Sequence, residues 1–408
     1  MILAAFRTKS FRFQWSADLL TSWAFEMETL TLGWYVMQQT GSVLLLTAFG
    51  SLQFLGTLAA PMFGVLADRV GARAMLCAMR AVYAALAALV AVLAAAGWLT
   101  PVWVLVLATL GGLVRPNDVV MRNTLIGESI PSEHFMGALA LSRATMDSAR
   151  AGGALAGAAL TAALGLGVTY AVVTGVYLTS LALTLGVARR PPVPDPAGVT
   201  RAAMPTPSGW RELVDGLTHV VTTPPLLAMM VLAFVINVSA YPISGGLLPY
   251  AAQRVYQVGA TGLGLLAASF AIGALLGSIA MVVTGGPRNP ARATLVHTTL
   301  WYVMLLLFSQ VERMAVGMAT LFVAGFVQSI AMISMAATLL AEADVSFRAR
   351  VMGVRMLAVY GLPLGLLAAG FVIPRLGYPT TIALSAAVGL VVTILIGLRW
   401  RAAMWRPR

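Results

Sequence analysis

The chain has 408 residues, of which 60% are hydrophobic and only 10% are charged, with a formal net charge of +12. Mean hydropathy is +0.89, and a soluble domain would carry roughly 25% charged residues, so the composition excludes an ordinary soluble protein. The single cysteine, Cys77, excludes an intramolecular disulfide, and the three histidines lack ligand spacing, so we expect no metal and no cofactor. The first fifteen residues lack the pattern of a removable signal peptide.

Twelve apolar runs are long enough to cross a membrane as helices, which requires about 20 residues each. The fifth run carries charges, and the eleventh is interrupted by Pro363. We therefore predict an all-α membrane protein with twelve transmembrane helices in two six-helix bundles. In chain order the runs are 12–38, 43–67, 73–97, 101–126, 136–164, 167–188, 224–249, 259–284, 290–311, 314–340, 350–374 and 377–399.

The basic residues are unevenly distributed between the two sides of the predicted membrane protein. With a cytoplasmic N-terminus, eighteen Lys and Arg residues fall in inside segments, whereas the outside loops hold only Arg254, Arg313 and Arg375. Cytoplasmic loops of membrane proteins carry such an excess of positive charge. The sequence therefore predicts that both termini are cytoplasmic, and that the positive charge sets topology and does not bind nucleic acid.

Residues 189–223 form a predicted cytoplasmic linker between the bundles 1–188 and 224–408. Six prolines between 191 and 207 forbid a regular helix there. The segment WRELVDGLTHV that follows is typical of a short amphipathic helix at a membrane surface. Helices five, eight and eleven each carry two glycines four residues apart, which lets helix backbones approach closely. Six helices, a linker and six more helices is the layout of a transporter built from two parallel repeats.

The loop between the second and third runs reads GVLADRVGAR, residues 64–73. It resembles the signature loop of the major facilitator superfamily, G-x-L-A-D-R-x-G-x-R, and it stands after the second of twelve helices, where that family has it. The resemblance implies the major facilitator fold and transport by alternating access. It also implies a cytoplasmic gate motif, formed by Gly64, Asp68, Arg69, Gly71 and Arg73.

The resemblance implies that Asp68 caps or pairs with helix eleven in the outward-open state, and that Arg69 and Arg73 make cytoplasmic ion pairs. A carboxylate is favourable at a helix N-terminus, and glycines permit a tight turn. A topogenic turn with arginines is the alternative. Three further segments, LGWYVMQQTGS (32–42), WRELVDGLTHV (210–220) and RARVMGVRMLAVYGLPLGLLAAG (348–370), look like the branch that holds bacterial siderophore exporters and multidrug efflux pumps.

Ionisable residues at membrane depth are concentrated in the first six predicted helices. Helices four and five each carry an Arg-Asp-Arg stripe whose spacing places it on one helix face, and helix one adds three carboxylates. A charge at bilayer depth is costly and marks a candidate functional site. The residues are Arg115, Asp118 and Arg122 in helix four, Arg143, Asp147 and Arg150 in helix five, and Asp18, Glu26 and Glu28 in helix one.

The two central carboxylates are candidates for proton coupling. At 1.5 Å per residue, Glu26 and Glu28 fall near mid-bilayer, at a depth similar to that of Arg115 and Arg150. A contact of Glu26 with either arginine is feasible, whereas Glu28 points about 200° away round the helix. A low-dielectric cavity favours a protonated carboxyl group and a nearby arginine favours an ionised one. We therefore predict a proton-coupling set of these four residues and Asp118; structural ion pairs between helices one, four and five are the alternative.

Two further groups complete the candidate sites. Charges nearer the cytoplasm, Asp18, Arg122, Arg143 and Asp147, are predicted to form a network at the intracellular gate. Aromatic side chains of helix one could line a cavity or face lipid, and neutral polar groups could bind substrate or join helices. The predicted cavity lining is Trp23, Phe25, Glu26, Asn117, Asn237, Tyr241, Gln328 and Tyr360.

The leading hypothesis is a monomeric exporter in a bacterial inner membrane, which expels a small amphipathic molecule such as a drug or siderophore in exchange for protons. A proton-coupled importer, or a lipid or anion transporter, is the alternative, because Arg115 and Arg150 could bind a carboxylate or phosphate. The layout and the buried charges argue against a channel, scaffold or receptor. No P-loop and no nucleophile–base pair is present, which argues against an ATP-driven pump and against an enzyme. The expected partners are the substrate, protons and membrane lipid.

Overall fold

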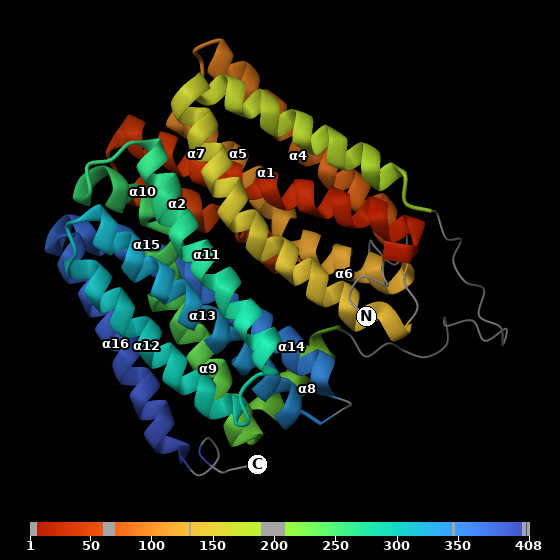
Figure 1. Cartoon of the computed structure of the whole chain (residues 1–408), viewed down its shortest axis with the longest axis vertical. Helices are drawn as coiled ribbons and strands as arrows, with labels where there is room; N and C mark the ends of the chain where they lie inside the picture. The colour runs from red at the N-terminus through yellow and green to blue at the C-terminus, as the bar shows by residue number, and fades with distance from the viewer. Residues whose placement is uncertain are drawn as a thin grey trace.

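The computed structural model describes residues 6–59, 70–129, 132–188, 209–344, 347–401 and 405. Those ranges are helical and contain no strand. Figure 1 shows the helices of the first half of the chain together at the upper right and those of the second half at the lower left. The predicted all-α architecture is therefore confirmed.

The first half of the chain contains long helices interrupted by short 3₁₀ turns. Two of these turns, η2 and η3, fall in the middle of predicted spans two and four. The elements are α1 (Lys9–Thr40), α2 (Val43–Leu52), η2 (Leu55–Ala59), α4 (Ala72–Ala95), α5 (Pro101–Val114), η3 (Arg115–Asn117), α6 (Asp118–Ser129) and α7 (Ser132–Leu185).

The second half begins with the surface helix α8 and then repeats the pattern of long helices with short breaks. The elements are α8 (Gly209–Thr222), α9 (Pro224–Ser239), the π-helical turn η5 (Pro242–Gly246), α10 (Leu248–Tyr250), η6 (Ala251–Val255), α11 (Ala260–Thr284), α12 (Pro290–Gln310), α13 (Met314–Glu342), α14 (Arg348–Leu357), η8 (Ala358–Tyr360), α15 (Gly361–Leu376) and α16 (Tyr378–Arg399).

Nine helices within the described ranges are long and apolar enough to cross a membrane. The helices follow the twelve predicted runs in order, with α1 matching the first run and α2 the start of the second. The fifth and sixth runs together form α7, which is divided at Gly165, where a φ of 77° ends the helical conformation. A positive φ costs little only for glycine, so this residue allows the chain to reverse. The eleventh run is broken at η8, three residues before Pro363.

Glycines place helix backbones in direct contact within each half. A Cβ atom on Gly153 would lie 2.8 Å from the carbonyl oxygen of Trp23 in α1, and one on Gly365 would lie 1.9 Å from that of Val238 in α9. A Cβ on Gly273 would lie 1.9 Å from the carbonyl oxygen of Phe322 in α13. No side chain fits at these distances. The close packing predicted for the fifth, eighth and eleventh spans, which are the first part of α7, α11 and α15, is therefore confirmed.

The two halves of the chain meet through α1, α2 and α7 on one side and α10, α11 and α15 on the other. A Cβ on Gly370 would lie 3.2 Å from the Cβ of Thr47, and one on Gly264 would lie 2.4 Å from the Cβ of Ala158. Ser51 Oγ also donates a hydrogen bond of 3.1 Å to the carbonyl oxygen of Pro363. The two glycine contacts lie toward the ends of the helices that are remote from the chain termini. The predicted domain boundaries remain a prediction.

Candidate functional site

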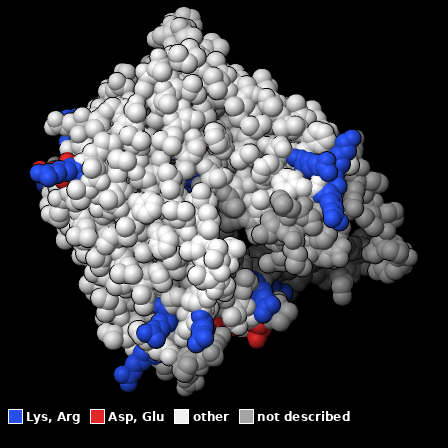
Figure 2. Space-filling model, viewed as in Figure 1, with Lys and Arg blue, Asp and Glu red and all other residues white. Residues whose placement is uncertain are grey.

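A cavity of about 350 Å³ lies between the two halves of the chain. Side chains of α1, α2 and α7 line one side, and η5, α10, α11 and α15 line the other. Figure 2 shows the surface hollowed between the two halves. The π-helical turn η5 widens the helical path here, because Leu247 N bonds to Pro242 O, five residues back, at 2.9 Å. Such π turns are frequent at functional sites.

Two charged side chains, Glu26 and Arg150, belong to the cavity lining. Arg150 Nε lies 3.7 Å from Glu26 Oε1, and the side chains are 40% and 37% exposed. The carboxylate of Glu26 is therefore accessible from the cavity between the halves. The sequence allowed a contact of Glu26 with Arg115 or with Arg150, and the structure shows the one with Arg150. The structure pairs Arg115 with Glu28 instead.

The wall around this pair is mostly apolar. Phe49, Phe54, Phe270 and Leu366 line the cavity, and Tyr241 supplies a hydroxyl group. The Tyr241 hydroxyl accepts a hydrogen bond of 2.8 Å from Gln328 Nε2, and its ring lies edge-on to Trp301. The tyrosine is thus held in place by side chains behind the cavity wall.

Of the predicted lining residues, Glu26 and Tyr241 line this cavity and the other six do not. Trp23 packs against Gly152, Phe25 packs on Tyr83, and Asn117 donates to the carbonyl oxygen of Gly56. Asn237 donates to Ala233 O in its own helix, and Gln328 lies behind Tyr241. Tyr360 lies in η8. The sequence identified these side chains by type, but which face of a helix meets the cavity is decided by tertiary packing.

Glu28 lies in a second, more enclosed site, and its side chain is only 10% exposed. Its Oε2 atom forms an ion pair with Arg115 and accepts a hydrogen bond of 2.6 Å from the Tyr177 hydroxyl. Arg115 also donates to Gln53 Oε1 at 3.0 Å and lies 4.6 Å from the centre of the Phe25 ring. A charged carboxylate inside a helix bundle needs such donors, because unpaired burial is costly.

Gln53 connects the two carboxylate sites. It lines both the central cavity and the small pocket beside Glu28 and Arg115. It lies at the C-cap of α2, where the helix ends before η2, and its side chain accepts hydrogen bonds from Arg115 and from Thr29. Sequence reasoning missed this residue; a polar side chain in an apolar run was the available signal.

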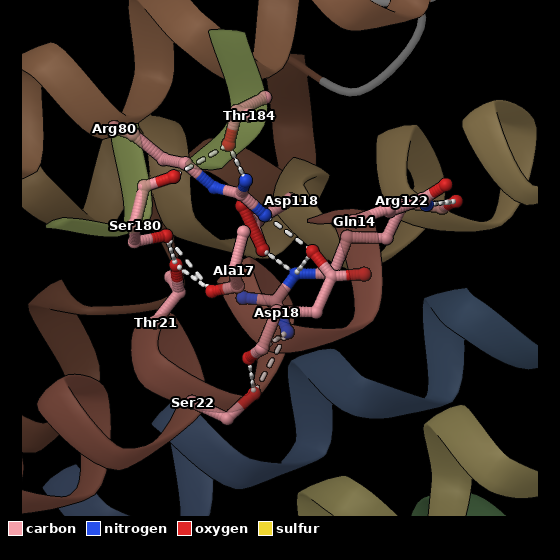
Figure 3. A network of polar contacts seen from close by, with 10 residues as sticks. All are labelled: Gln14, Ala17, Asp18, Thr21, Ser22, Arg80, Asp118, Arg122, Ser180 and Thr184. Carbon is pink, nitrogen blue, oxygen red and sulfur yellow. Dashed lines mark hydrogen bonds and ion pairs between the residues drawn. The ribbon is translucent and has the colours of Figure 1, made fainter. Parts of the chain in front are cut away.

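A third group of charges joins α1, α4 and α6, and Figure 3 shows it from close by. Arg80 pairs with Asp18, and Arg122 pairs with Asp118. Arg122 Nε lies 3.6 Å from Asp18 Oδ1, so the four charges form one network. All four side chains are at most 6% exposed. Thr184, in the second part of α7, accepts a hydrogen bond from Arg80.

Neutral polar groups surround this network. Arg122 donates to Ser22 Oγ at 2.7 Å and to the carbonyl oxygen of Asp18 at 3.2 Å. Gln14 donates to the carbonyl oxygen of Arg122 at 2.9 Å. The hydroxyls of Thr21 and Ser180 lie 2.6 Å apart, which ties α1 to the second part of α7. Protein oxygens therefore supply part of the hydrogen bonding that water would give to Arg122.

The structure regroups the predicted charges. The charges of the fourth predicted span, Arg115, Asp118 and Arg122, do face α1, but they belong to two separate groups. Arg115 pairs with Glu28, whereas Asp118 pairs with Arg122, which also approaches Asp18. Asp118 therefore lies in the network of Figure 3, where Arg122 joins it to Asp18. Arg80 was not predicted, although an arginine inside an apolar run was a visible signal. The side chains of Arg143 and Asp147 lie outside the described part of the structure.

The predicted gate motif is described only in part. Gly64, Asp68 and Arg69 lie outside the described residues. Gly71 precedes α4 with a φ of 85°, and Arg73 donates a hydrogen bond of 2.6 Å to the carbonyl oxygen of Leu185. Within the described ranges no cluster of three or more His, Cys, Asp and Glu side chains could hold a metal ion.

Solved transporter structures share this fold at low sequence identity. A bacterial homologue of the human lysosomal transporter Spinster, in an inward-facing and unoccupied conformation, aligns with a TM-score of 0.73 and 14% identity, covering 98% of this chain and 99% of the other. The nucleoside transporter NupG gives 0.69 and 13%, covering 98% and 100%. A POT family transporter in complex with 5-aminolevulinic acid gives 0.70 and 12%, covering 96% of each chain. At these identities the likeness establishes the fold alone.

The sequence comparison establishes the family. No curated protein matches the sequence. The profile of the Major Facilitator Superfamily, however, matches residues 15–363, which is most of the chain. The chain therefore belongs to the Major Facilitator Superfamily: it is a multi-pass membrane protein and a secondary active transporter of a small molecule, and not an enzyme.

Proposed function

We propose that this transporter exports a small amphipathic molecule, such as a drug or siderophore, in exchange for protons. The observation that carries the proposal is the position of Glu26, a partly exposed carboxylate in the wall of an otherwise mostly apolar central cavity. A carboxylate placed at membrane depth is costly, and its most direct use is to bind and release a proton or a cationic group.

The shape and lining of the cavity support an amphipathic substrate. Its volume of about 350 Å³ lies in the lower part of the range of small-molecule sites, which is roughly 300–1,000 Å³. Aromatic and aliphatic side chains offer an apolar surface, and Glu26, Arg150 and Tyr241 offer a few polar contacts. Such a mixture suits a molecule with one apolar body and few polar groups.

The two glutamates are suited to different parts of a coupled cycle. Glu26 is open to the cavity, where water or substrate can exchange a proton with it. Glu28 is held by Arg115 and Tyr177, so its protonation would release an arginine that also contacts Gln53 at the cavity wall. Through Gln53, a change of charge at Glu28 can reach the cavity without direct contact with substrate.

The direction and setting of transport are part of the same proposal. The positive-inside distribution supports cytoplasmic termini, and the resemblance to siderophore exporters and multidrug pumps supports a monomer in a bacterial inner membrane. With that topology the close contacts between the halves, at Gly370 and Gly264, lie at the outer side. The cavity would then open toward the cytoplasm, the conformation in which the Spinster homologue was solved.

A proton-coupled importer, or a transporter of lipids or anions, is the second candidate. The observation that favours it is Arg150, whose guanidinium group belongs to the same cavity wall. A guanidinium group recognises carboxylates and phosphates through paired hydrogen bonds. If the substrate is an anion, Arg150 takes the role of anchor and Glu26 the role of its counter-ion.

Everted membrane vesicles with an imposed pH gradient test the proposal. Lipophilic cations, siderophores and organic anions are added in turn, and lumenal pH is followed by dye quenching. We expect proton release triggered by at least one compound, and its loss in Glu26→Gln or Glu28→Gln. Glu312→Gln, at an exposed loop position, is the matched control.

The outcomes separate the candidates. A response that both glutamine variants retain would contradict proton coupling through these residues. Absence of any response in everted vesicles, together with proton-dependent uptake of an anion into right-side-out vesicles, would replace export by import. Loss of that uptake in Arg150→Gln would then assign the anion to this cavity wall.

A further inference from the structure

A groove of about 750 Å³ lies on the outside of the second half, between α12 and α16. It is separate from the central cavity and shares no lining residue with it. Leu295, Val296 and Leu300 form one wall on α12, and Ile394 and Leu398 form the other on α16. Its floor is Gly397, where a Cβ atom would lie 3.5 Å from Leu295 Cδ1.

The groove has the length of a lipid chain segment in one leaflet. It extends along α16 from Thr393 to Arg401, which at 1.5 Å per residue is about 12 Å. Half of the hydrocarbon core of a bilayer is about 15 Å thick. Thr393, the one polar residue of α16 at the deep end, donates its hydroxyl to Gly389 O at 2.7 Å, and Thr299 of α12 is the other uncharged polar residue of the mostly aliphatic lining.

One end of the groove is basic. Arg401 and Trp405 belong to its lining, and the guanidinium group of Arg292 lies 4.9 Å from the Trp405 ring. Arg288 and Arg399 are exposed near the same end of α12 and α16, and Figure 2 shows basic side chains at this lower end of the molecule. Residues 285–311 and 378–408 contain no Asp or Glu, so this positive charge has no acidic partner on either helix.

We propose that this groove binds an anionic phospholipid, with one acyl chain between α12 and α16 and the phosphate held by Arg401 and Arg292. Basic pockets at the cytoplasmic ends of transmembrane helices bind anionic head groups, and a tryptophan suits the interface between chain and head group. A second copy of the chain is a less suitable occupant, because a two-fold contact would bring the two sets of arginines together.

Native mass spectrometry of the purified, delipidated transporter tests the site. The protein is titrated with phosphatidylglycerol and, separately, with phosphatidylcholine of the same acyl chains. We expect tighter binding of phosphatidylglycerol, and a loss of about fivefold in its affinity for each of Arg401→Gln and Arg292→Gln. Arg313→Gln, an exposed arginine at the N-cap of α13, is the matched control and should bind as the wild type does.

A second variant tests the groove without changing charge. Gly397→Leu places a side chain in the floor, where the first added atom has only an ordinary contact with Leu295, so the helix is retained. We expect it to weaken both lipids, and Gly175→Leu, at an exposed glycine with nothing within 4 Å, to weaken neither.

Three outcomes would overturn the proposal. Equal affinities for the two lipids would remove the role of the arginines, and unchanged binding in Gly397→Leu would remove the groove. A dimer that dissociates in Gly397→Leu would assign the groove to a second copy. Because the readout is lipid binding, the result is independent of which substrate is transported.

Discussion

Arg80 is a fully buried arginine whose counter-charge is supplied by another helix. Its side chain is 0% exposed and pairs with Asp18 of α1, which Arg122 also approaches. The four charges of this network sum to zero, and the hydroxyl groups of Thr184 and Ser22 accept hydrogen bonds from Arg80 and Arg122. Removal of one member therefore leaves a charge without compensation, which costs more than the pair itself contributes.

The residue-scale prediction follows from that imbalance. Arg80→Met should lower the free energy of unfolding by about 3–5 kcal/mol, because Asp18 and Asp118 would then share a single arginine. The double variant Arg80→Met/Asp18→Asn restores neutrality and should recover part of the loss. Thermal unfolding in detergent measures both. A single variant as stable as the wild type would show that the network is open to water.

Helix packing at the scale of elements repeats between the two halves. In the first half α7 approaches α1 through Gly153 and Gly157, and in the second half α15 approaches α9 through Gly361 and Gly365. In the first half α2 and α5 are likewise in contact at Gly112, and in the second half α11 and α13 are in contact at Gly273. Equivalent helices thus use the same contact, which is the expectation for two parallel repeats.

Gly365→Ala tests these contacts. A Cβ at this position would lie 1.9 Å from the carbonyl oxygen of Val238, so the helices must separate, at a cost of about 1–3 kcal/mol or more. We expect a lower unfolding temperature and a lower yield of monodisperse protein. Gly175→Ala lies in open space within α7 and should be neutral or slightly stabilising. Equal behaviour of the two variants would contradict the packing.

The helices could be predicted from the sequence where the length of an apolar run or a break between two runs determines them. The apolar runs follow from the thickness of a bilayer, and the reversal inside α7 coincides with the gap between runs five and six. The partner of Arg115 was not predictable, because Glu26 and Glu28 lie at similar depth and only the rotation of α1 selects between them. For the same reason Asn237 was assigned to the cavity, although its side chain bonds to Ala233 within α9.

At the scale of the whole molecule, transport by alternating access requires relative motion of the two halves, and we propose that this transporter uses it. The halves are in contact at Thr47 and Gly370, where an added Cβ would lie 3.2 Å from that of Thr47. That separation is a few tenths of an ångström shorter than the ~3.5–4.5 Å between the Cβ atoms of a disulfide. A bond at this point would hold the halves together at the end remote from the chain termini.

Thr47→Cys combined with Gly370→Cys, in a Cys77→Ala background, tests this motion. We expect oxidation to abolish transport and a reducing agent to restore it, because the cavity can no longer open at that end. The single variant Thr47→Cys should transport under both conditions. Transport that continues in a fully oxidised double variant would exclude separation of the halves at this contact.

The pairing of charges inside the first half has an electrical consequence. Four carboxylates, Asp18, Glu26, Glu28 and Asp118, lie in ion pairs with four arginines, so this set carries no net charge through the membrane field. A displaced unit charge would experience about 2.3 kcal/mol per 100 mV. When the two halves move relative to each other, the eight paired groups therefore add no electrical free energy as a set. The membrane voltage acts on the transport cycle through the charge of the substrate and of the protons that are exchanged for it.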